Sequence, residues 1–135
     1  MSTPRVPLDC PCGSGERFAV CCLPLHRGRG SGRVTAPTAE RLMRSRYSAF
    51  AVGDPGYLLS SWHPSTRPRT LDLDPEIEWR GLEILGTTAG GEDDDRGTVE
   101  FVARHWDYAA RRRGEQREDS AFVREDGQWF YVGEA

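Results

Sequence analysis

The chain has 135 residues, of which 37% are hydrophobic and 29% charged, and its formal net charge is −3. This composition is that of a globular chain, because disorder goes with fewer apolar residues, and the repeats of collagen and coiled coils are absent. No apolar run approaches the roughly 20 residues that span a bilayer, and the first nine residues lack the apolar core of a signal peptide. We therefore expect a cytoplasmic domain with a small appendage and no membrane span.

Charge is divided unevenly along the chain. Residues 1–46 carry eight arginines and three acids, for a net charge of +5, whereas residues 47–135 carry ten arginines and 18 acids, for −8. A basic front third favours contact with phosphates or with an acidic partner. The alternative is a weak attraction between the two parts of one molecule.

All four cysteines fall within thirteen residues, and a histidine follows four residues later. Because thiols stay reduced in the cytosol, such a cluster indicates metal binding rather than disulfides. Gly13 and Gly15 free the loop backbone to approach the sulfurs. Ser14 can cap a short helix that begins near Gly15 and carries the second cysteine pair at its far end. Four thiolates around one tetrahedral ion make a closed structural zinc site with no position for water.

The fourth ligand of this site has two candidates. Adjacent cysteines point in different directions, so Cys21 and Cys22 cannot chelate as a C-x-x-C pair does. The ligands are therefore either all four cysteines, or Cys10, Cys12, one of the adjacent pair and His26. The remaining possibility is that the cysteines are free thiols or a redox pair.

The run Cys-Pro-Cys-Gly-Ser-Gly, followed by Cys-Cys, resembles the SEC-C motif, the metal-binding tail of the translocation ATPase SecA. In SecA tails the run ends Cys-His, and Cys22 stands here at the histidine position. The resemblance implies one structural zinc ion held by Cys10, Cys12, Cys21 and Cys22. It also implies a protein partner, such as a chaperone or the ribosome. Residues 1–30 are predicted to be this SEC-C zinc-binding motif.

Residues 31–37 are predicted to be a linker, and residues 38–135 a second domain. Arginines stand among glycines in and just before the linker, at Arg27, Arg29 and Arg33. Such a stretch is typical of a solvated tether, and it also allows contact with an RNA backbone.

Two helices follow the linker. Thr38 is placed to cap the first helix, which Gly53 ends. Asp54-Pro55 starts the second helix with a capping carboxylate and a proline at the first helical position, and Pro64 follows its end. The buried face of the first helix is predicted from apolar residues near helical spacing: Ala39, Met43, Tyr47 and Phe50.

From residue 77 onward the apolar residues alternate, which predicts strands. A shift of this alternation near Arg80-Gly81 indicates a β-bulge. Asp126-Gly127 between two apolar runs predicts a tight hairpin that places Phe122 opposite Tyr131. Two helices before an antiparallel meander give an α+β fold.

This layout resembles the cone-shaped fold of nuclear transport factor 2 and ketosteroid isomerase, in which a curved sheet wraps helices and leaves a pocket at its open end. The cysteine run, residues 38–50 and residues 124–131 together resemble the bacterial YchJ family. That family has no established activity, so the resemblance implies an architecture: an N-terminal SEC-C zinc knuckle beside a nuclear transport factor 2-like domain.

His105 and Asp107 are the candidates for acid–base catalysis. They lie two residues apart on the strand expected over 98–108, so they share a face with the apolar residues before them and would approach the pocket mouth. A carboxylate beside a histidine in an apolar pocket can shift both pKa values toward neutrality. The alternative is that both residues are polar because the strand is leaving the core.

Arg44 and Arg46 on the first helix allow two interpretations. One is a structural ion pair that pins the sheet through a carboxylate such as Glu100 or Glu118. The other is binding of a carboxylate or phosphate group of a ligand.

The sequence favours a non-catalytic, cytoplasmic zinc protein that contacts a protein or the ribosome, with RNA contact through Arg27, Arg29 and Arg33. The alternative is a small-molecule-binding or enzymatic cone domain that uses a pocket near His105 and Asp107. No nucleophile elbow, phosphate loop or dinucleotide fingerprint in the sequence favours an enzyme.

Overall fold

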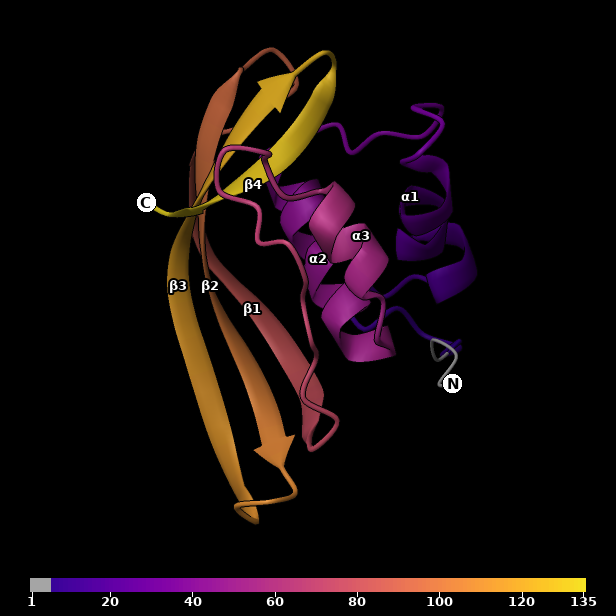
Figure 1. Ribbon diagram of the computed structural model, residues 1–135, viewed down its shortest axis with the longest axis vertical. Coiled ribbons are helices and arrows are strands. Elements are labelled where there is room, and N and C mark those ends of the chain that lie inside the picture. The colour runs from indigo at the N-terminus through magenta and orange to yellow at the C-terminus, as the bar shows by residue number, and fades with distance from the viewer. Residues whose placement is uncertain (1–5) are drawn as a thin grey trace.

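A computed structural model describes residues 6–135 (Figure 1). In this part of the chain, two helices lie on one face of a four-stranded antiparallel sheet, and the cysteine-rich segment lies on the far side of those helices. The elements are the 3-10 turn η1 (Phe18–Val20), helices α1 (Cys22–Gly28), α2 (Ala39–Val52) and α3 (Pro55–Ser60), and strands β1 (Ile77–Ala89), β2 (Arg96–Asp107), β3 (Arg112–Glu125) and β4 (Gln128–Glu134). The predicted α+β fold is confirmed. Among residues 6–135, no helix has the length and apolar character needed to cross a membrane.

The ends of α2 and α3 lie where their capping residues predict. The Thr38 hydroxyl accepts a hydrogen bond from a backbone N–H of the first turn of α2 at 3.1 Å. Gly53 ends α2 in the left-handed conformation, with φ of 79°, which glycine adopts without a steric penalty. The Asp54 carboxylate then accepts a hydrogen bond from the backbone N–H of Tyr57 at 3.1 Å, and Pro55 begins α3. These local interactions are sufficient to turn the chain between the two helices.

The strands follow one another in the sheet in their chain order, from β1 to β4. The register of β1 against β2 shifts between Trp79 and Gly81, which confirms the predicted bulge, and shifts again between Ile84 and Gly86. Bulges bend a strand and increase its twist. The resulting sheet curves around the helices, as Figure 1 shows.

The hairpin between β3 and β4 also has the predicted register. Asp126 and Gly127 take φ values of 52° and 76°, the positive values that a two-residue type I′ turn requires. Phe122 pairs with Tyr131, and Val123 pairs with the residue before it. The predicted pairing of Phe122 with Tyr131 is therefore confirmed.

The main core lies between α2 and the sheet. Its fully buried members come from both layers: Leu42, Val99, Phe122 and Trp129. Of the predicted α2 stripe, Ala39, Met43 and Tyr47 are buried and Phe50 is partly buried. A separate small cluster joins the cysteines to Val52 at the end of α2. The cysteine-rich segment therefore shares a helix with the main core.

The segment before α1 differs from its prediction. No helix begins near Gly15, because Gly13 and Gly15 take left-handed φ values of 80° and 86° and turn the chain sharply. The Ser14 hydroxyl accepts a hydrogen bond from a backbone N–H two residues later at 3.2 Å, and it lies 3.2 Å from the Cys21 sulfur. Ser14 thus closes a loop rather than capping a helix, and α1 begins only after Cys21.

The stretch between α1 and α2 is not a solvated tether along its whole length. Arg29 is only 9% exposed, and it donates hydrogen bonds to the backbone carbonyls of Ser60 at 3.1 Å and Trp129 at 2.9 Å. Its guanidinium carbon lies 4.7 Å from the centre of the Phe130 ring, and Ala36 is part of the core. Composition alone indicated a tether, but a long arginine side chain can fasten such a stretch to distant carbonyls.

Candidate metal centre

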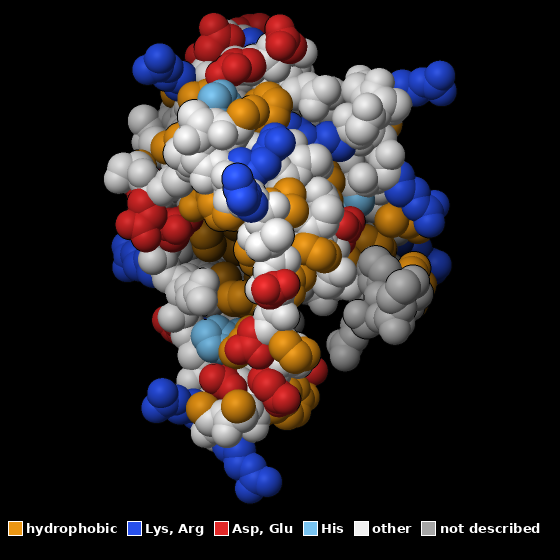
Figure 2. All heavy atoms as spheres, viewed as in Figure 1, with side chains coloured by type: hydrophobic (Ala, Val, Ile, Leu, Met, Phe, Trp, Pro, Cys, Tyr) orange, Lys and Arg blue, Asp and Glu red, His pale blue; other side chains and the backbone are white. Residues whose placement is uncertain are grey.

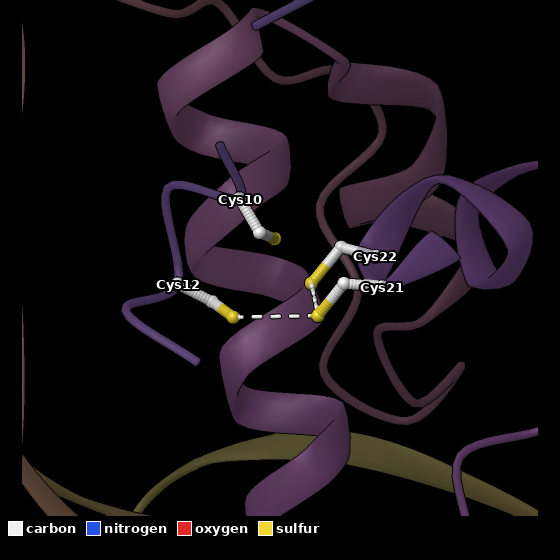
Figure 3. A group of neighbouring side chains, drawn as sticks. All are labelled: Cys10, Cys12, Cys21 and Cys22. Carbon is white, nitrogen blue, oxygen red and sulfur yellow. Dashed lines mark hydrogen bonds between the residues drawn. The ribbon is translucent and has the colours of Figure 1, made fainter. Parts of the chain in front are cut away.

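The four cysteines come together where the N-terminal loop meets α1 (Figure 3). Cys10 and Cys12 lie on the loop, Cys21 and Cys22 lie at the start of α1, and their four sulfurs lie within 4.8 Å of one another. The Cys12 and Cys21 sulfurs are 3.7 Å apart, and those of Cys21 and Cys22 are 3.9 Å apart. A disulfide would bring two sulfurs to about 2.05 Å, and all four cysteines are free thiols. The cluster can therefore hold a metal ion.

The adjacent cysteines reach one centre because of the backbone at Cys21. This residue takes φ of −109° and ψ of −93°, outside the helical region, and Cys22 is the first residue of α1. The sequence indicated only that neighbouring side chains diverge. The turn at Cys21 removes that divergence, so both sulfurs face the sulfurs of the loop.

Most of the cluster is closed to solvent. Cys12 and Cys22 are fully buried, Cys10 is 6% exposed, and Cys21 is partly exposed. The Phe18 ring, 1% exposed, packs with them. The site is thus an interior feature with one edge toward solvent.

Two arginines of α2 donate hydrogen bonds into the cluster. Arg41 donates to the Cys22 sulfur at 3.3 Å and to the Cys21 carbonyl at 2.7 Å. Arg44 donates to the Cys12 carbonyl at 2.7 Å. Guanidinium groups at this position offset the negative charge of thiolates. The interaction also fixes both cysteine segments to the same helix.

Ser48, one helical turn further along α2, completes this wall, and its hydroxyl lies 3.4 Å from the Cys10 sulfur. Arg41, Arg44 and Ser48 are spaced so that they share one face of the helix. The sequence shows this polar face, apart from the apolar stripe, but it gives no signal that the cysteines cover it. Sequence reasoning therefore missed Arg41 and Ser48, and it gave Arg44 a different role from its contact with the cysteine loop.

The thiols affect one another's protonation. Hydrogen bonding with the Cys10 thiol lowers the pKa of Cys12, while hydrogen bonding with Cys10 and Cys12 raises the pKa of Cys22. Hydrogen bonding among the thiols thus favours the thiolate form of Cys12 and the thiol form of Cys22. Converting all four thiols to thiolates requires a cation at their centre, because metal ligation and deprotonation are coupled.

His26, the alternative fourth ligand, lies outside the sulfur cluster. Its Nε2 atom lies 2.8 Å from the Ser45 carbonyl oxygen, and its Nδ1 atom lies 4.0 Å from the Asp54 carboxylate. The ring packs against Phe18 and Tyr57, at centroid distances of 5.7 and 4.4 Å. Burial lowers the pKa of His26, which favours the neutral ring. These contacts give His26 a packing role between α1 and the other two helices.

The structure places His105 and Asp107 away from the cavity beneath the helices. The end of β2 extends beyond α2 and α3 (Figure 1), and neither residue lines that cavity. The His105 ring packs on Trp79 at 5.3 Å. Asp107 accepts hydrogen bonds from the backbone N–H groups of Ala109 and Ala110, at 3.0 and 3.1 Å, and so caps the turn to β3. His105 lines a separate, open pocket with Arg104 and Glu115, and Asp107 lines neither pocket, so the two residues do not converge on one pocket as the sequence led us to expect.

Arg44 and Arg46 do not pin the sheet through Glu100 or Glu118. Besides the cysteine loop, Arg44 contacts Glu40 on its own helix at 3.1 Å. Arg46 donates to the carbonyl of Leu58 and the hydroxyl of Ser61, both at 2.7 Å. The two arginines therefore join the helices and the loop rather than the two layers.

This combination of a cysteine cluster and a helix-covered curved sheet defines a class of protein. The family model described as the SEC-C motif matches residues 9–24, and the model described as the YchJ middle NTF2-like domain matches residues 38–134. The chain belongs to the YchJ family, whose relatives carry the name UPF0225 protein. The predicted resemblance is confirmed.

The similarity covers almost the whole chain. The UPF0225 protein of Streptomyces coelicolor is 50% identical over 123 residues, which are 91% of both chains. That of Chromobacterium violaceum is 50% identical over 126 residues, 91% of this chain and 89% of the relative. The solution structure of a SEC-C motif protein from Rhodopseudomonas palustris is 32% identical, with a TM-score of 0.76, and covers 93% of this chain and 96% of its own. A crystal structure from Psychrobacter arcticus, 28% identical, has a TM-score of 0.74 and covers 91% of this chain and 79% of its own.

Proposed function

We propose that the four cysteines hold one structural zinc ion. Zinc–thiolate bonds of about 2.3 Å in a regular tetrahedron place the sulfurs about 3.8 Å apart, and the separations of 3.7 and 3.9 Å agree with this spacing. Soft thiolate ligands favour zinc over hard cations. Four sulfurs leave no position for a reacting water, which supports a structural role. The contact of His26 with the Ser45 carbonyl supports the all-sulfur ligand set.

Metal content tests this assignment. Protein purified under reducing conditions should contain about one zinc per chain by mass spectrometry. Cys22→Ser should lose the metal because it removes a thiolate ligand, whereas His26→Gln should retain it because His26 lies outside the sulfur cluster. Zinc that stays with Cys22→Ser and leaves with His26→Gln would show that the histidine is the fourth ligand. Wild-type protein with far less than one zinc per chain would contradict the proposal.

We also propose that the zinc knuckle serves to bind a protein partner in the cytoplasm. The carrying observation is that the Leu8 and Val20 side chains are 67% and 69% exposed, whereas the Phe18 ring of the same segment is buried against the cysteines. The backbone N–H of Phe18 donates to the Leu8 carbonyl at 3.0 Å, so the two exposed side chains lie on joined segments. A metal site without an open position is suited to hold such a surface rigid rather than to perform chemistry.

Contact with RNA has less support than contact with a protein. Of the three arginines expected to reach an RNA backbone, Arg29 is buried and its guanidinium donates to backbone carbonyls. Arg27 and Arg33 are exposed. Two exposed arginines supply a weak, salt-sensitive attraction to phosphates, whereas the apolar side chains favour a contact that persists in salt.

A pull-down with the intact, zinc-loaded chain separates the two kinds of partner. We expect a polypeptide, a ribosomal protein included, to stay bound at high salt and after nuclease treatment. The double variant Leu8→Glu, Val20→Glu should release it, because charge in an apolar contact is unfavourable. The control Arg27→Glu, Arg33→Glu should still bind. Loss of binding in salt and in the arginine variant, with the apolar variant unaffected, would contradict the proposal and indicate RNA.

A further inference from the structure

A cavity of about 160 Å³ lies between α2 and the inner face of the sheet, apart from the cysteine cluster. Most of its wall is apolar, and its aromatic rings include those of Phe50, Trp62, Trp79 and Phe101. In Figure 2, hydrophobic side chains are recessed in a hollow near the middle of the face that is shown. An apolar cavity of about 150 Å³ can hold a benzene molecule. The space therefore suits a ligand with about one ring.

Arg46 brings a buried positive charge to this cavity. It is only 4% exposed and lines the cavity wall. Its guanidinium carbon lies 4.5 Å from the centre of the Tyr131 ring and 5.3 Å from that of Trp62. Burial lowers the pKa of Arg46 to about 10, so the group is still charged at neutral pH. Within residues 6–135, no carboxylate lies within ion-pair distance of Arg46, and the attraction of the Glu118 carboxylate only partly offsets the cost of burying this charge.

The structural role of Arg46 uses only part of its guanidinium group. One nitrogen, Nη1, makes both hydrogen bonds that join α2 to the end of α3, to Leu58 and Ser61. The Nε and Nη2 atoms have no acceptor in the described part of the chain. A guanidinium fork binds a carboxylate through two parallel hydrogen bonds, and no neutral group matches that geometry as well.

Glu118 on β3 lines the same cavity and carries the opposite charge. One carboxylate oxygen, Oε2, accepts hydrogen bonds from the hydroxyls of Ser120 and Tyr131, the latter at 3.2 Å. The other oxygen, Oε1, has no donor among residues 6–135. Tyr131 connects the two charges, because its ring faces Arg46 and its hydroxyl contacts Glu118. The cavity thus offers donors on one side and an acceptor on another, with aromatic walls around them.

We propose that this cavity binds a small aromatic carboxylate that also carries an amino or hydroxyl group. The carboxylate of the ligand accepts hydrogen bonds from Arg46, and its amino or hydroxyl group donates to Glu118. Its ring packs among Trp62, Trp79 and Phe101. This site is independent of the proposed zinc ion, and it replaces the location near His105 and Asp107 that the sequence indicated.

Titration calorimetry on the intact, zinc-loaded chain tests the site with three probes: 4-aminobenzoate, benzoate and aniline. We expect 4-aminobenzoate to bind saturably and to quench tryptophan fluorescence, because two tryptophans line the cavity. Benzoate and aniline should each bind about tenfold more weakly, since each lacks one charge-assisted hydrogen bond. Arg46→Gln should weaken 4-aminobenzoate at least about tenfold for the same reason.

The Glu118→Gln variant keeps the test decisive if Arg46→Gln fails to fold. It should bring the affinities for 4-aminobenzoate and benzoate within about threefold of each other, because a neutral amide is a weaker acceptor. The matched control is Glu100→Gln on the neighbouring strand, where Glu100 pairs with Arg117 at 2.9 Å and does not line the cavity. It should bind like the wild type. No saturable binding of any probe by the wild type, or an unchanged preference in Glu118→Gln, overturns the proposal.

Discussion

Cys12→Ser is expected to destabilise the whole domain and not only the knuckle. Cys12 is fully buried, and its carbonyl accepts a hydrogen bond from Arg44 on α2, the helix that also forms the main core. In small metal sites the free energy of metal binding is free energy of folding. Losing it should remove a large part of the roughly 5–15 kcal/mol by which a native domain is stable. Thermal unfolding followed by the circular dichroism of the strands should show one transition at a markedly lower temperature.

Treating the wild type with a chelator should reproduce the unfolding transition of Cys12→Ser. The control is His26→Gln, which is expected to retain its zinc, so that a change in its unfolding reports loss of packing and not loss of metal. The opposite outcome has a clear physical meaning. If chelation unfolded only residues ~10–26 and left the melting of the sheet unchanged, the hydrogen bonds from α2 would contribute little. The knuckle would then be the independent unit that the glycine-rich stretch indicated.

The parts of the fold that were predicted from sequence are those decided by local chemistry. The side chains of Thr38 and Asp54 cap the starts of α2 and α3, because each accepts a hydrogen bond from a backbone N–H three residues later. Gly53 ends α2 in the left-handed conformation. The turn at Asp126-Gly127 requires two positive φ values, which few other residue pairs adopt. Its position then sets the register of the whole hairpin. Such features need no knowledge of the rest of the molecule.

The predictions that failed depended on contacts between distant segments. Ser14 has the chemistry of a helix cap, but the sulfur of Cys21 lies beside its hydroxyl and the glycines around it turn the chain. The alternation of residues along β2 predicted that His105 faces the cavity, but the part of β2 that carries His105 lies beyond the helices. In the metal centre, cysteine spacing indicated the cluster, but nothing local to Arg41 shows that it faces sulfur atoms. Tertiary arrangement decides all three.

Arg29→Ala is expected to lower the free energy of unfolding by about 2–4 kcal/mol, and Arg27→Ala to leave it nearly unchanged. The Arg29 guanidinium donates to the carbonyls of Ser60 and Trp129, which join α3 and β4 to the stretch after α1. Truncation leaves both carbonyls without this donor and uncovers the Phe130 ring. Urea unfolding of the two variants, fitted with a common slope, gives the comparison.

Comparing Arg27→Ala with Arg29→Ala separates the effect of the buried side chain on stability from the effect of its charge, because each substitution removes one positive charge from the same basic stretch. A third variant, Arg29→Met, keeps the apolar stem over Phe130 but removes the donors, so it should fall between Arg29→Ala and the wild type. Similar stabilities for Arg27→Ala and Arg29→Ala would contradict the role of the buried guanidinium. They would mean that the stretch after α1 is held loosely enough for Arg29 to reach the surface, where it would again be available to a phosphate backbone.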